Sequence, residues 1–262
     1  MLIESNKKHI ASLINLWHRV FGDDEEYIKL FFRKAYFNSD TFAITVDDEV
    51  VSALYLLKAE IKCDGNTYEG RYLYAAATLP EYRGKGLMSQ LIKEAAEYAA
   101  GKNFDFIALV PASDSLYNYY ERFGYKEAMY KYKLTVDCDT ATMRAFREID
   151  DFKEFFDIRN SAKDNMLSYD KVTSEYAFEC LRFTGNRIFS IGDKAFYAEN
   201  EELFIADENV GISDMFLRNL CGENEIYSNR PLKNAVKVRN GMVYALNRGL
   251  NNKEFNMNIA LD

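Results

Sequence analysis

The sequence predicts an α/β protein with a mixed sheet, in which antiparallel strands precede a helix and a further, parallel strand. Two segments with helical spacing of apolar residues open the chain. Residues 41–79 then show the alternation and turn residues of successive strands. After another helical segment, residues 104–111 ("FDFIALVP") are almost wholly apolar, which is typical of a strand that is buried on both faces.

The first helix is predicted over residues 9–22 and the second over residues 23–37. Gly22 should end the first helix, and "DDEE" places acidic side chains in the first turn of the second, where they complement the helix dipole. The apolar residues of the first helix recur at the spacing of one helix face. They are Ile10, Leu13, Ile14, Trp17, Val20 and Phe21.

Residues 41–79 should form three or four strands, with turns at Asp47-Asp48 and at Asp64-Gly65-Asn66. The apolar rows of the next segment predict a helix over residues 87–100, with Gly101 as its C-terminal cap. Strand 104–110 follows it.

A short helix is predicted over residues 113–124, capped by Ser113 or Asp114, and a last strand over residues 125–136. The predicted order is therefore helix, helix, antiparallel strands, helix, parallel strand, helix and strand.

The rest of the chain repeats this order of elements without repeating the residues. The segment 135–143 ("TVDCDTATM") is polar, so we expect a boundary there, with one domain over residues 1–135 and a second over 140–262. In the second domain, helices are predicted over 151–162, 174–183 and 212–220, and strands within 187–207, 225–229 and 236–247.

Composition narrows the classes of function. The net charge is −8, with 17 basic and 19 acidic residues in 1–135 and 16 basic and 22 acidic residues in the remainder. This charge argues against a nucleic-acid partner. It suits a cationic partner, and it is equally explained by simple solubility. The only histidines are His9 and His18, so neither a Ser–His–Asp triad nor a histidine-rich metal site is expected.

The four cysteines are scattered without a CxxC pair, which favours reduced thiols, no zinc site and a cytoplasmic location. The charged N-terminus does not resemble a signal peptide, and no run reaches the roughly 18 apolar residues of a membrane helix. We therefore expect no metal and no membrane partner.

Residues 73–100 pass from a strand into a helix through a turn that holds Arg83, Gly84, Lys85 and Gly86. The first N–H groups of a helix have no partner within it and lie at its positive end, so an anion is stabilised there. Glycines let a phosphate approach the backbone. Two glycines alone would equally suit an ordinary solvated loop.

The surrounding motifs favour the phosphate site. "LPEYRGKGLM" resembles the acetyl-CoA pyrophosphate loop of the GNAT acetyltransferase superfamily, (Gln/Arg)-x-x-Gly-x-(Gly/Ala), matched by Gly84 and Gly86, with Glu81 as a departure at the first position. "YYERFGY" resembles the Tyr-x-x-x-Gly-Phe segment of the same family, matched by Tyr120, Gly124 and Tyr125. The resemblance covers roughly residues 1–135.

The resemblance implies a GNAT fold for residues 1–135, with a sheet that opens between strands 72–79 and 104–110, followed by a degenerate GNAT-like domain. The whole is similar to the first two domains of the enhanced-intracellular-survival type of enzyme. The pantetheine arm of acetyl-CoA would enter the opening and pair with Ala77, Thr78 and Leu79. The pyrophosphate would meet the backbone of Arg83, Gly84, Lys85, Gly86, Leu87 and Met88.

By the same resemblance, Tyr120 would hydrogen-bond the departing thiolate. Tyr119 is the alternative residue for this role. Both tyrosines could instead be core residues of a buried stripe along the helix. No spacing of residues selects a general base, so Glu60, Glu69 and a chain of water molecules remain alternatives. In three-domain relatives the C-terminal carboxylate lies in the active site, but we do not assign that role to Asp262.

The expected function is transfer of an acetyl group to a primary amine, small or protein-borne, by direct attack. The alternatives are a non-catalytic acyl-CoA-binding or regulatory module, and transfer of a longer acyl group; a homo-oligomer is compatible with each. The equivalent turn of the second half, "FIADENVGISDMFL", has one glycine, Gly211, and no cation. It should bind no acetyl-CoA, and the second half should wall the amine cleft, mediate dimerisation or stabilise its neighbour.

Overall fold

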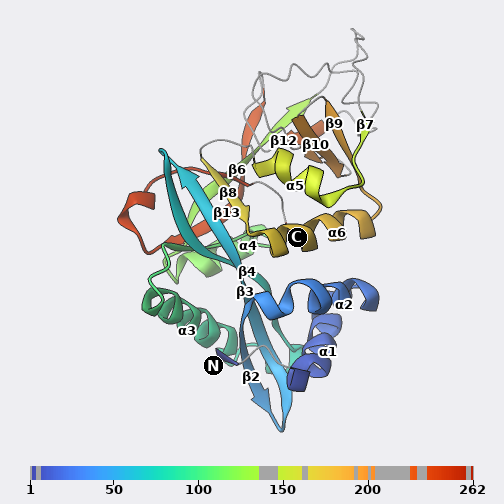
Figure 1. The fold of residues 1–262 in the computed structure, drawn as a ribbon. Helices are drawn as coiled ribbons and strands as arrows, with labels where there is room; N and C mark the ends of the chain where they lie inside the picture. The colour runs from blue at the N-terminus through green and yellow to red at the C-terminus, as the bar shows by residue number, and fades with distance from the viewer. Residues whose placement is uncertain are drawn as a thin grey trace.

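The computed structural model describes residues 2–3, 7–135, 147–160, 165–191, 194–199, 202–203, 225–228, 235–257 and 261. The first half follows the predicted order (Figure 1). Its elements are β1 (Leu2–Ile3), α1 (Ile10–Phe21), α2 (Glu25–Lys34), β2 (Asp40–Val46), β3 (Glu49–Cys63), β4 (Asn66–Thr78), α3 (Leu87–Gly101), β5 (Phe106–Leu109), α4 (Asp114–Glu121) and β6 (Lys126–Thr135).

The ends of the first two helices follow from local chemistry. Gly22 ends α1 in the left-handed region, at φ 76°, and donates its N–H to the His18 carbonyl at 2.9 Å. The Asp24 side chain begins α2 by accepting the N–H groups of Glu26 and Tyr27. Both helices confirm the expectation from the sequence.

Residues 41–79 form three strands, and both predicted turns are present. Asp47 and Asp48 have φ values of 50° and 64°, and Asp64 and Gly65 have 50° and 74°, which is the conformation of a two-residue hairpin turn. The prediction for Gly101 is wrong, because this residue is the last of α3. Lys102 and Asn103 end the helix instead, with Asn103 at φ 57°.

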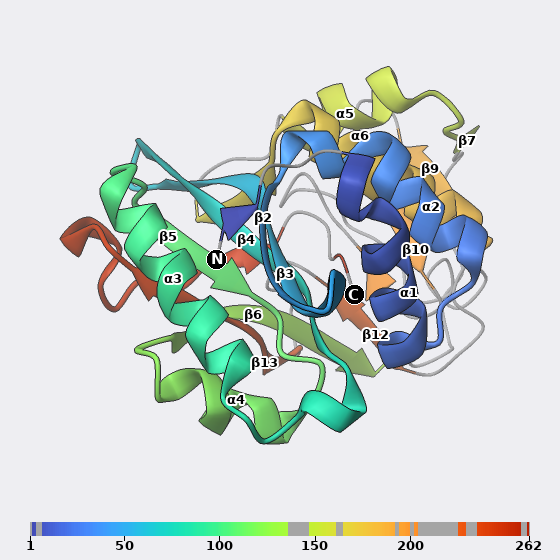
Figure 2. The ribbon, with the colours of Figure 1, turned by 90° about the horizontal axis from the view of Figure 1, so that it is seen from below.

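Helices cover both faces of the sheet. Helices α1 and α2 lie on one face, and α3 and α4 lie side by side on the other (Figure 2). Side chains alternate along β3, so that Tyr55 and Leu57 join the core under α1 and α2, whereas Leu54 and Leu56 join the core under α3 and α4.

The sheet opens between β4 and β5, as expected. The two strands pair in parallel at three positions, from Gly70 opposite Phe106 to Tyr72 opposite Ala108. Beyond Tyr72 the two strands have no further paired positions, although β4 continues to Thr78 on β3. This leaves one side of the later part of β4 without a neighbouring strand of the described chain.

Strands from the second half enter the same sheet. Strand β13 (Val236–Ala245) lies between β5 and β6 and is antiparallel to both, and β8 (Met166–Tyr169) pairs with β3. The other described elements are β7 (Arg147–Glu148), α5 (Phe152–Asn160), α6 (Lys171–Phe183), β9 (Arg187–Ile191), β10 (Lys194–Glu199), β11 (Glu202–Leu203), β12 (Glu225–Ser228) and β14 (Asn256–Met257). The predicted helix 212–220 and the boundary at 136–143 lie outside the described residues, so the division into two domains stays a prediction.

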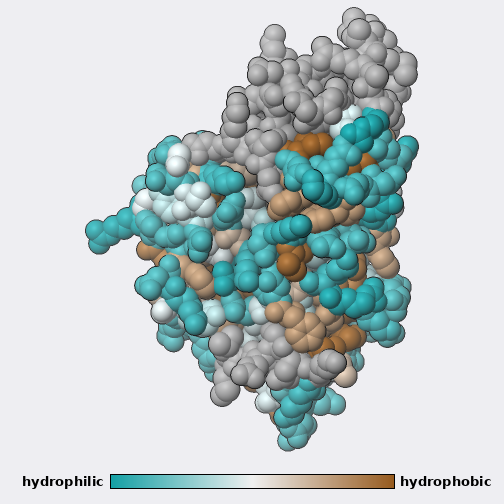
Figure 3. Space-filling view, viewed as in Figure 1, coloured by the Kyte–Doolittle hydropathy of each residue, from teal (hydrophilic) through white to brown (hydrophobic). Residues whose placement is uncertain are grey.

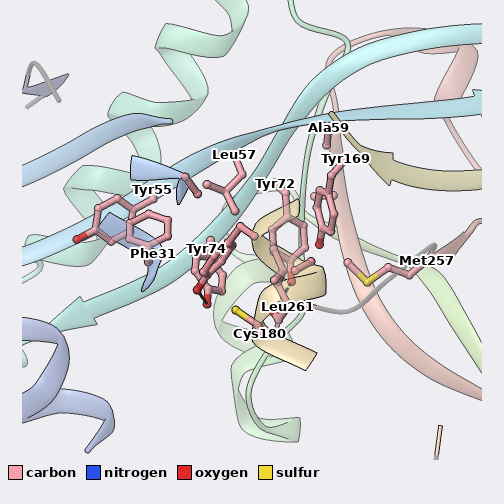
Figure 4. Packing of buried hydrophobic residues seen from close by; sticks show 14 of the residues in the cluster. Phe31, Tyr55, Leu57, Ala59, Tyr72, Tyr74, Tyr169, Cys180, Met257 and Leu261 are labelled. Atoms are coloured by element: carbon pink, nitrogen blue, oxygen red, sulfur yellow. Dashed lines mark hydrogen bonds between the residues drawn. The ribbon is translucent and has the colours of Figure 1, made fainter. Parts of the chain in front are cut away.

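The two halves also share a core. Figure 4 shows Tyr55, Tyr72 and Tyr74 of β3 and β4 packed beside residues of the second half. The Tyr74 and Tyr176 hydroxyls are hydrogen-bonded at 2.9 Å, and the Tyr72 hydroxyl donates to the carbonyl of Leu261 at 3.3 Å. The first half is therefore packed against later parts of the chain through the strand that borders the opening.

The face of the molecule drawn in Figure 3 is mainly hydrophilic, with hydrophobic side chains in small separate groups. Among the residues that the structure describes, no helix is long and apolar enough to cross a membrane. Cys63 and Cys180 are buried, and neither is part of a disulfide in the described chain.

Candidate functional site: the loop between β4 and α3

The loop after β4 turns sharply to begin α3. Pro80–Tyr82 form one turn of 3-10 helix, Arg83 is extended, and the Arg83 Nε donates to the Thr78 carbonyl at 3.1 Å. Gly86 is the N-cap residue of α3, and the N-cap makes no side-chain hydrogen bond. The loop therefore brings the start of α3 beside the end of β4.

Gly84 and Gly86 are needed for their backbone conformation. Their φ values are 75° and 80°, in the region that favours glycine. A Cβ on either residue would have no atom of the described chain within 4 Å, so both face open space. The glycines thus shape the loop and leave its backbone accessible to a ligand.

The start of α3 offers N–H groups and cations to an anion. In any helix the first N–H groups have no intrahelical partner. In α3 the Gln90 N–H donates to the Gly86 carbonyl at 3.0 Å, which leaves the N–H groups before Gln90 for a ligand. Lys85 lies with its Nζ 4.6 Å from the centre of the Tyr82 ring. Within the described chain, neither Arg83 nor Lys85 forms an ion pair with a carboxylate within 4 Å, although Lys85 has an electrostatic interaction with Glu81. These features fit a diphosphate.

Glu81, the departure from the family pattern, is neutralised by a neighbour. Its carboxylate lies 2.9 Å from the Arg19 guanidinium of α1. The backbone hydrogen bond of Glu81 and then this Arg19 contact lower the pKa of the carboxyl below its ordinary value. An ionised carboxylate is therefore tolerated beside the loop because it faces a cation.

β4 is interrupted by a bulge where the sheet opens. Two residues, Ala75 and Ala76, stand opposite Leu54, and Ala75 has φ 46° although it is not glycine. Such backbone strain is concentrated at functional sites. The small side chains of Ala75, Ala76 and Ala77 allow a ligand to approach this part of the strand closely, and no local pattern in the sequence predicts the bulge.

Beyond the bulge, the backbone groups of β4 alternate between β3 and the open side. The Leu79 N–H donates to the Val51 carbonyl of β3 at 2.9 Å, and the Ala77 carbonyl accepts from the Ser52 hydroxyl. The Leu79 N–H is therefore committed to β3 and the Leu79 carbonyl accepts from the Tyr82 N–H, while the pairing of Ala77, Thr78 and Leu79 with a pantetheine arm stays a prediction. Because directions alternate along a strand, Thr78 is the predicted residue whose backbone faces the opening.

Tyr120 is a residue of α4, and its side chain is part of the core on that face of the sheet, where it is 7% exposed. Its ring contacts that of Tyr119 at 5.3 Å and that of Tyr125 at 5.7 Å. Burial, followed by the neighbouring Tyr119, raises the pKa of Tyr120 above its ordinary value. A neutral phenol that can donate a hydrogen bond is the resulting chemical group.

A hollow of about 370 Å³ lies in front of the loop. Besides predicted residues of the loop, one wall of the hollow is formed by Tyr119 of α4 and by Arg122, which follows that helix. The Arg122 Cζ lies 4.9 Å from the centre of the Tyr119 ring, and the Tyr119 hydroxyl lies 3.2 Å from the Ser89 hydroxyl. Its lining residues are Thr78, Tyr82, Arg83, Gly84, Gly86, Leu87, Met88, Ser89, Tyr119 and Arg122.

The wall from α4 was missed by sequence reasoning, which assigned Tyr119 only as an alternative to Tyr120 and gave Arg122 no role. A cation two residues after the motif tyrosine was the available signal. Four of the predicted residues do not line the hollow: Ala77, Leu79, Lys85 and the predicted catalytic residue Tyr120.

The two carboxylates considered as a general base do not lie at this loop. Glu60 and Glu69 line a second hollow, of about 470 Å³, together with Lys58, Lys62 and Arg71. Glu60 is 3.2 Å from Lys62 and accepts from the Ser168 hydroxyl. The turn of the second half, residues 204–217, lies outside the described residues. Among the described residues, no group of three metal-binding side chains is present.

Comparison with known proteins agrees with this geometry. A family model described as "Acetyltransferase (GNAT) domain" matches residues 2–128. No curated protein matches the sequence.

Solved structures align over most of the chain at low sequence identity. A "Probable N-Acyltransferase" of Enterococcus faecalis aligns with 14% identity and a TM-score of 0.66, over 93% of this chain and 72% of its own. A GCN5-related N-acetyltransferase of Anabaena variabilis aligns with 16% identity and a TM-score of 0.64, over 93% of this chain and 72% of its own. Eis1 of Mycobacterium abscessus aligns with 11% identity and a TM-score of 0.62, over 93% of this chain and 73% of its own. The shared fold therefore extends beyond residue 135.

Proposed function

We propose that this protein, in which residues 2–128 match the model of the GNAT acetyltransferase domain, transfers the acetyl group of acetyl-CoA to a primary amine by direct attack. The observation that carries the proposal is the arrangement of the loop. Gly84 and Gly86 face open space at the start of α3, beside the end of β4 where the sheet has opened.

Acetyl-CoA fits this arrangement as a co-substrate. Its pyrophosphate is an anion that suits the free N–H groups of α3 and the loop cations Arg83 and Lys85. Thr78 offers a backbone N–H that faces the opening, while its carbonyl already accepts from the Arg83 Nε, and an extended amide chain such as pantetheine pairs with a strand edge through such groups. When bound, acetyl-CoA supplies the activated thioester.

The chain contributes two further actions. A backbone N–H at the bulge of β4, near Ala75, polarises the thioester carbonyl as oxyanion-type stabilisation. Tyr120 donates a hydrogen bond to the departing sulfur. Full proton transfer is unfavourable, because the ordinary pKa of tyrosine, about 10, already exceeds that of a thiol by about 1.5 units. Burial raises the pKa of Tyr120 further, so the hydroxyl acts as a donor that keeps its proton.

The second half serves as a wall of the amine cleft. Its helix α6 packs on β4 next to the bulge, through the hydrogen bond between Tyr176 and Tyr74. The excess of acidic residues after residue 135 favours the approach of a cationic amine, on a small molecule or on a protein. The reduced thiols Cys63 and Cys180 suit a cytoplasmic enzyme.

The test is release of free CoA thiol from acetyl-CoA with a panel of amines: spermidine, lysine ethyl ester and a lysine-containing peptide. Amine-dependent release, with the acetylated product identified by mass spectrometry, is the expected result. Binding of acetyl-CoA without release for any amine would instead favour a non-catalytic acyl-CoA-binding module. Titration should give one acetyl-CoA per chain, and two would show that the turn of the second half also binds.

A further inference from the structure

Four tyrosine rings form a row beneath α4. Successive ring centres are 5.3 Å apart for Tyr119 and Tyr120, 5.7 Å for Tyr120 and Tyr125, and 5.5 Å for Tyr125 and Tyr244. Tyr125 follows Gly124 at the position where the family pattern has phenylalanine. The row therefore contains one hydroxyl more than the pattern requires.

The Tyr125 hydroxyl is buried without a hydrogen-bond partner among the described residues. The residue is 1% exposed and packs among apolar side chains such as Met242 and Leu109. A buried donor without a partner destabilises the folded state, whereas phenylalanine would fill the same space without that cost. The hydroxyl therefore calls for a role outside packing.

The neighbouring Tyr120 can give the Tyr125 hydroxyl a role in the reaction. Its ring contacts two other tyrosines, and the Tyr119 hydroxyl is already 3.2 Å from the Ser89 hydroxyl at the hollow. Tyr125 is left as the contacting tyrosine with an uncommitted hydroxyl. Burial opposes any negative charge on Tyr120, as its raised pKa indicates, so a nearby donor matters most when charge develops there.

We propose that Tyr125 is a positioning residue that acts through Tyr120, by donating its O–H to the Tyr120 oxygen as the thioester breaks. This inference rests on the proposed function. The carbon–sulfur bond breaks as the carbon–nitrogen bond forms, and the electron pair stays on sulfur, which draws on the Tyr120 proton. Tyr125 stabilises the partial negative charge that builds up on the Tyr120 oxygen as its O–H is polarised toward the sulfur, and both tyrosines keep their protons. The proton lost by the amine leaves to solvent.

The test is Tyr125→Phe in the full chain, assayed with acetyl-CoA and the most active amine of the panel. Turnover should fall about tenfold to a hundredfold, the range for a hydrogen bond to a charged group. The Kd of acetyl-CoA should not change, and the denaturation midpoint should stay equal or rise, because an unpaired buried hydroxyl is removed. Tyr244→Phe is the matched control, since its ring contacts Tyr125 and not Tyr120, and it should keep wild-type turnover.

A double-mutant cycle separates this role from a structural one. If Tyr125 acts through Tyr120, Tyr120→Phe combined with Tyr125→Phe should be no slower than Tyr120→Phe alone. Wild-type turnover in Tyr125→Phe would overturn the inference and make Tyr125 an ordinary core residue. Additive losses in the double variant would overturn it too. Lack of turnover in the wild-type protein would be a failure of the proposed function instead.

Discussion

The Arg19 guanidinium of α1 lies 2.9 Å from the Glu81 carboxylate in the loop between β4 and α3. The contact joins residues 62 positions apart and sets a cation against the acidic departure from the loop pattern. Both side chains are about half exposed, so the pair adds little to stability and acts mainly on the local charge.

Arg19→Gln should therefore weaken acetyl-CoA binding by about two- to fivefold at low salt, because Glu81 then repels the diphosphate. Glu81→Gln should bind at least as tightly as wild type, and the double variant should return to that level. Calorimetry measures each Kd. Arg33→Gln, which removes an exposed cation paired with Glu26, is the charge-matched control. Equal affinity in wild type and Arg19→Gln would show that Glu81 does not face the ligand.

Gly86→Asp should abolish measurable acetyl-CoA binding, because it places a carboxylate and a Cβ in the space that the pyrophosphate needs. It should also cost about 1–2 kcal/mol of folding free energy, since φ is 80°. This cost in folding free energy follows from the φ value of Gly86, which the sequence does not give.

Gly65→Asp is the matched control for this variant. Gly65 has φ 74° and equally open space, but it lies in the turn at the other end of β4. It should lose similar stability in urea unfolding and keep wild-type affinity. Equal loss of affinity in both variants would attribute the effect to folding and not to the loop.

Local sequence signals predicted the elements and the loop, and long-range contacts could not be predicted from them. Gly84 and Gly86 sit between a strand and a helix, so their role followed from spacing. The pairing of Tyr244 in β13 with Ile107 in β5 depends on residues 137 positions apart, and no local pattern encodes it. The same holds for the contact between Arg19 and Glu81.

Conformational detail was also beyond the sequence. The bulge at Ala75 is fixed by its register against β3, not by the preference of alanine, which disfavours φ 46°. Arg122 was overlooked because a cation on an exposed helix face is ordinary, and only the fold brings it to the hollow.

Tyr120→Phe should lower turnover about 10²-fold while the Kd of acetyl-CoA stays constant, because the hydroxyl stabilises the transition state and not the ground state. Tyr117→Phe is the control: this tyrosine lies on the same helix, is 5% exposed and stacks under Arg239. Wild-type turnover in Tyr120→Phe would make it a core residue. The measurement to follow would be Tyr119→Phe.

Alkaline pH should destabilise the protein and leave the acid of the reaction in place. Burial raises the pKa of Tyr120 and of Tyr125 above the ordinary value of about 10, so the folded state keeps protons that the unfolded state loses. The stability from these groups is complete below about pH 10 and is lost as pH rises further. Urea unfolding from about pH 8 to 11 should show this decline. Turnover should show no loss from Tyr120 below about pH 10, and a decline there would assign the titration to another group.

Arg122→Gln should weaken binding of acetyl-CoA about tenfold, because the guanidinium faces the hollow and has no carboxylate partner in the described part of the chain. CoA carries two separate anionic groups, the pyrophosphate and the ribose 3′-phosphate, and the loop already offers N–H groups to the first. Arg122 is the C-cap residue of α4 and lines the hollow together with Tyr119, apart in the chain from the loop, so we expect it to bind the second. Dephospho-CoA should then bind the wild-type protein and Arg122→Gln equally well, while CoA should prefer the wild type. Lys93→Gln on α3 removes an exposed cation that does not line the hollow and should match the wild type with both ligands. A tenfold loss for dephospho-CoA as well would assign Arg122 to the pyrophosphate instead.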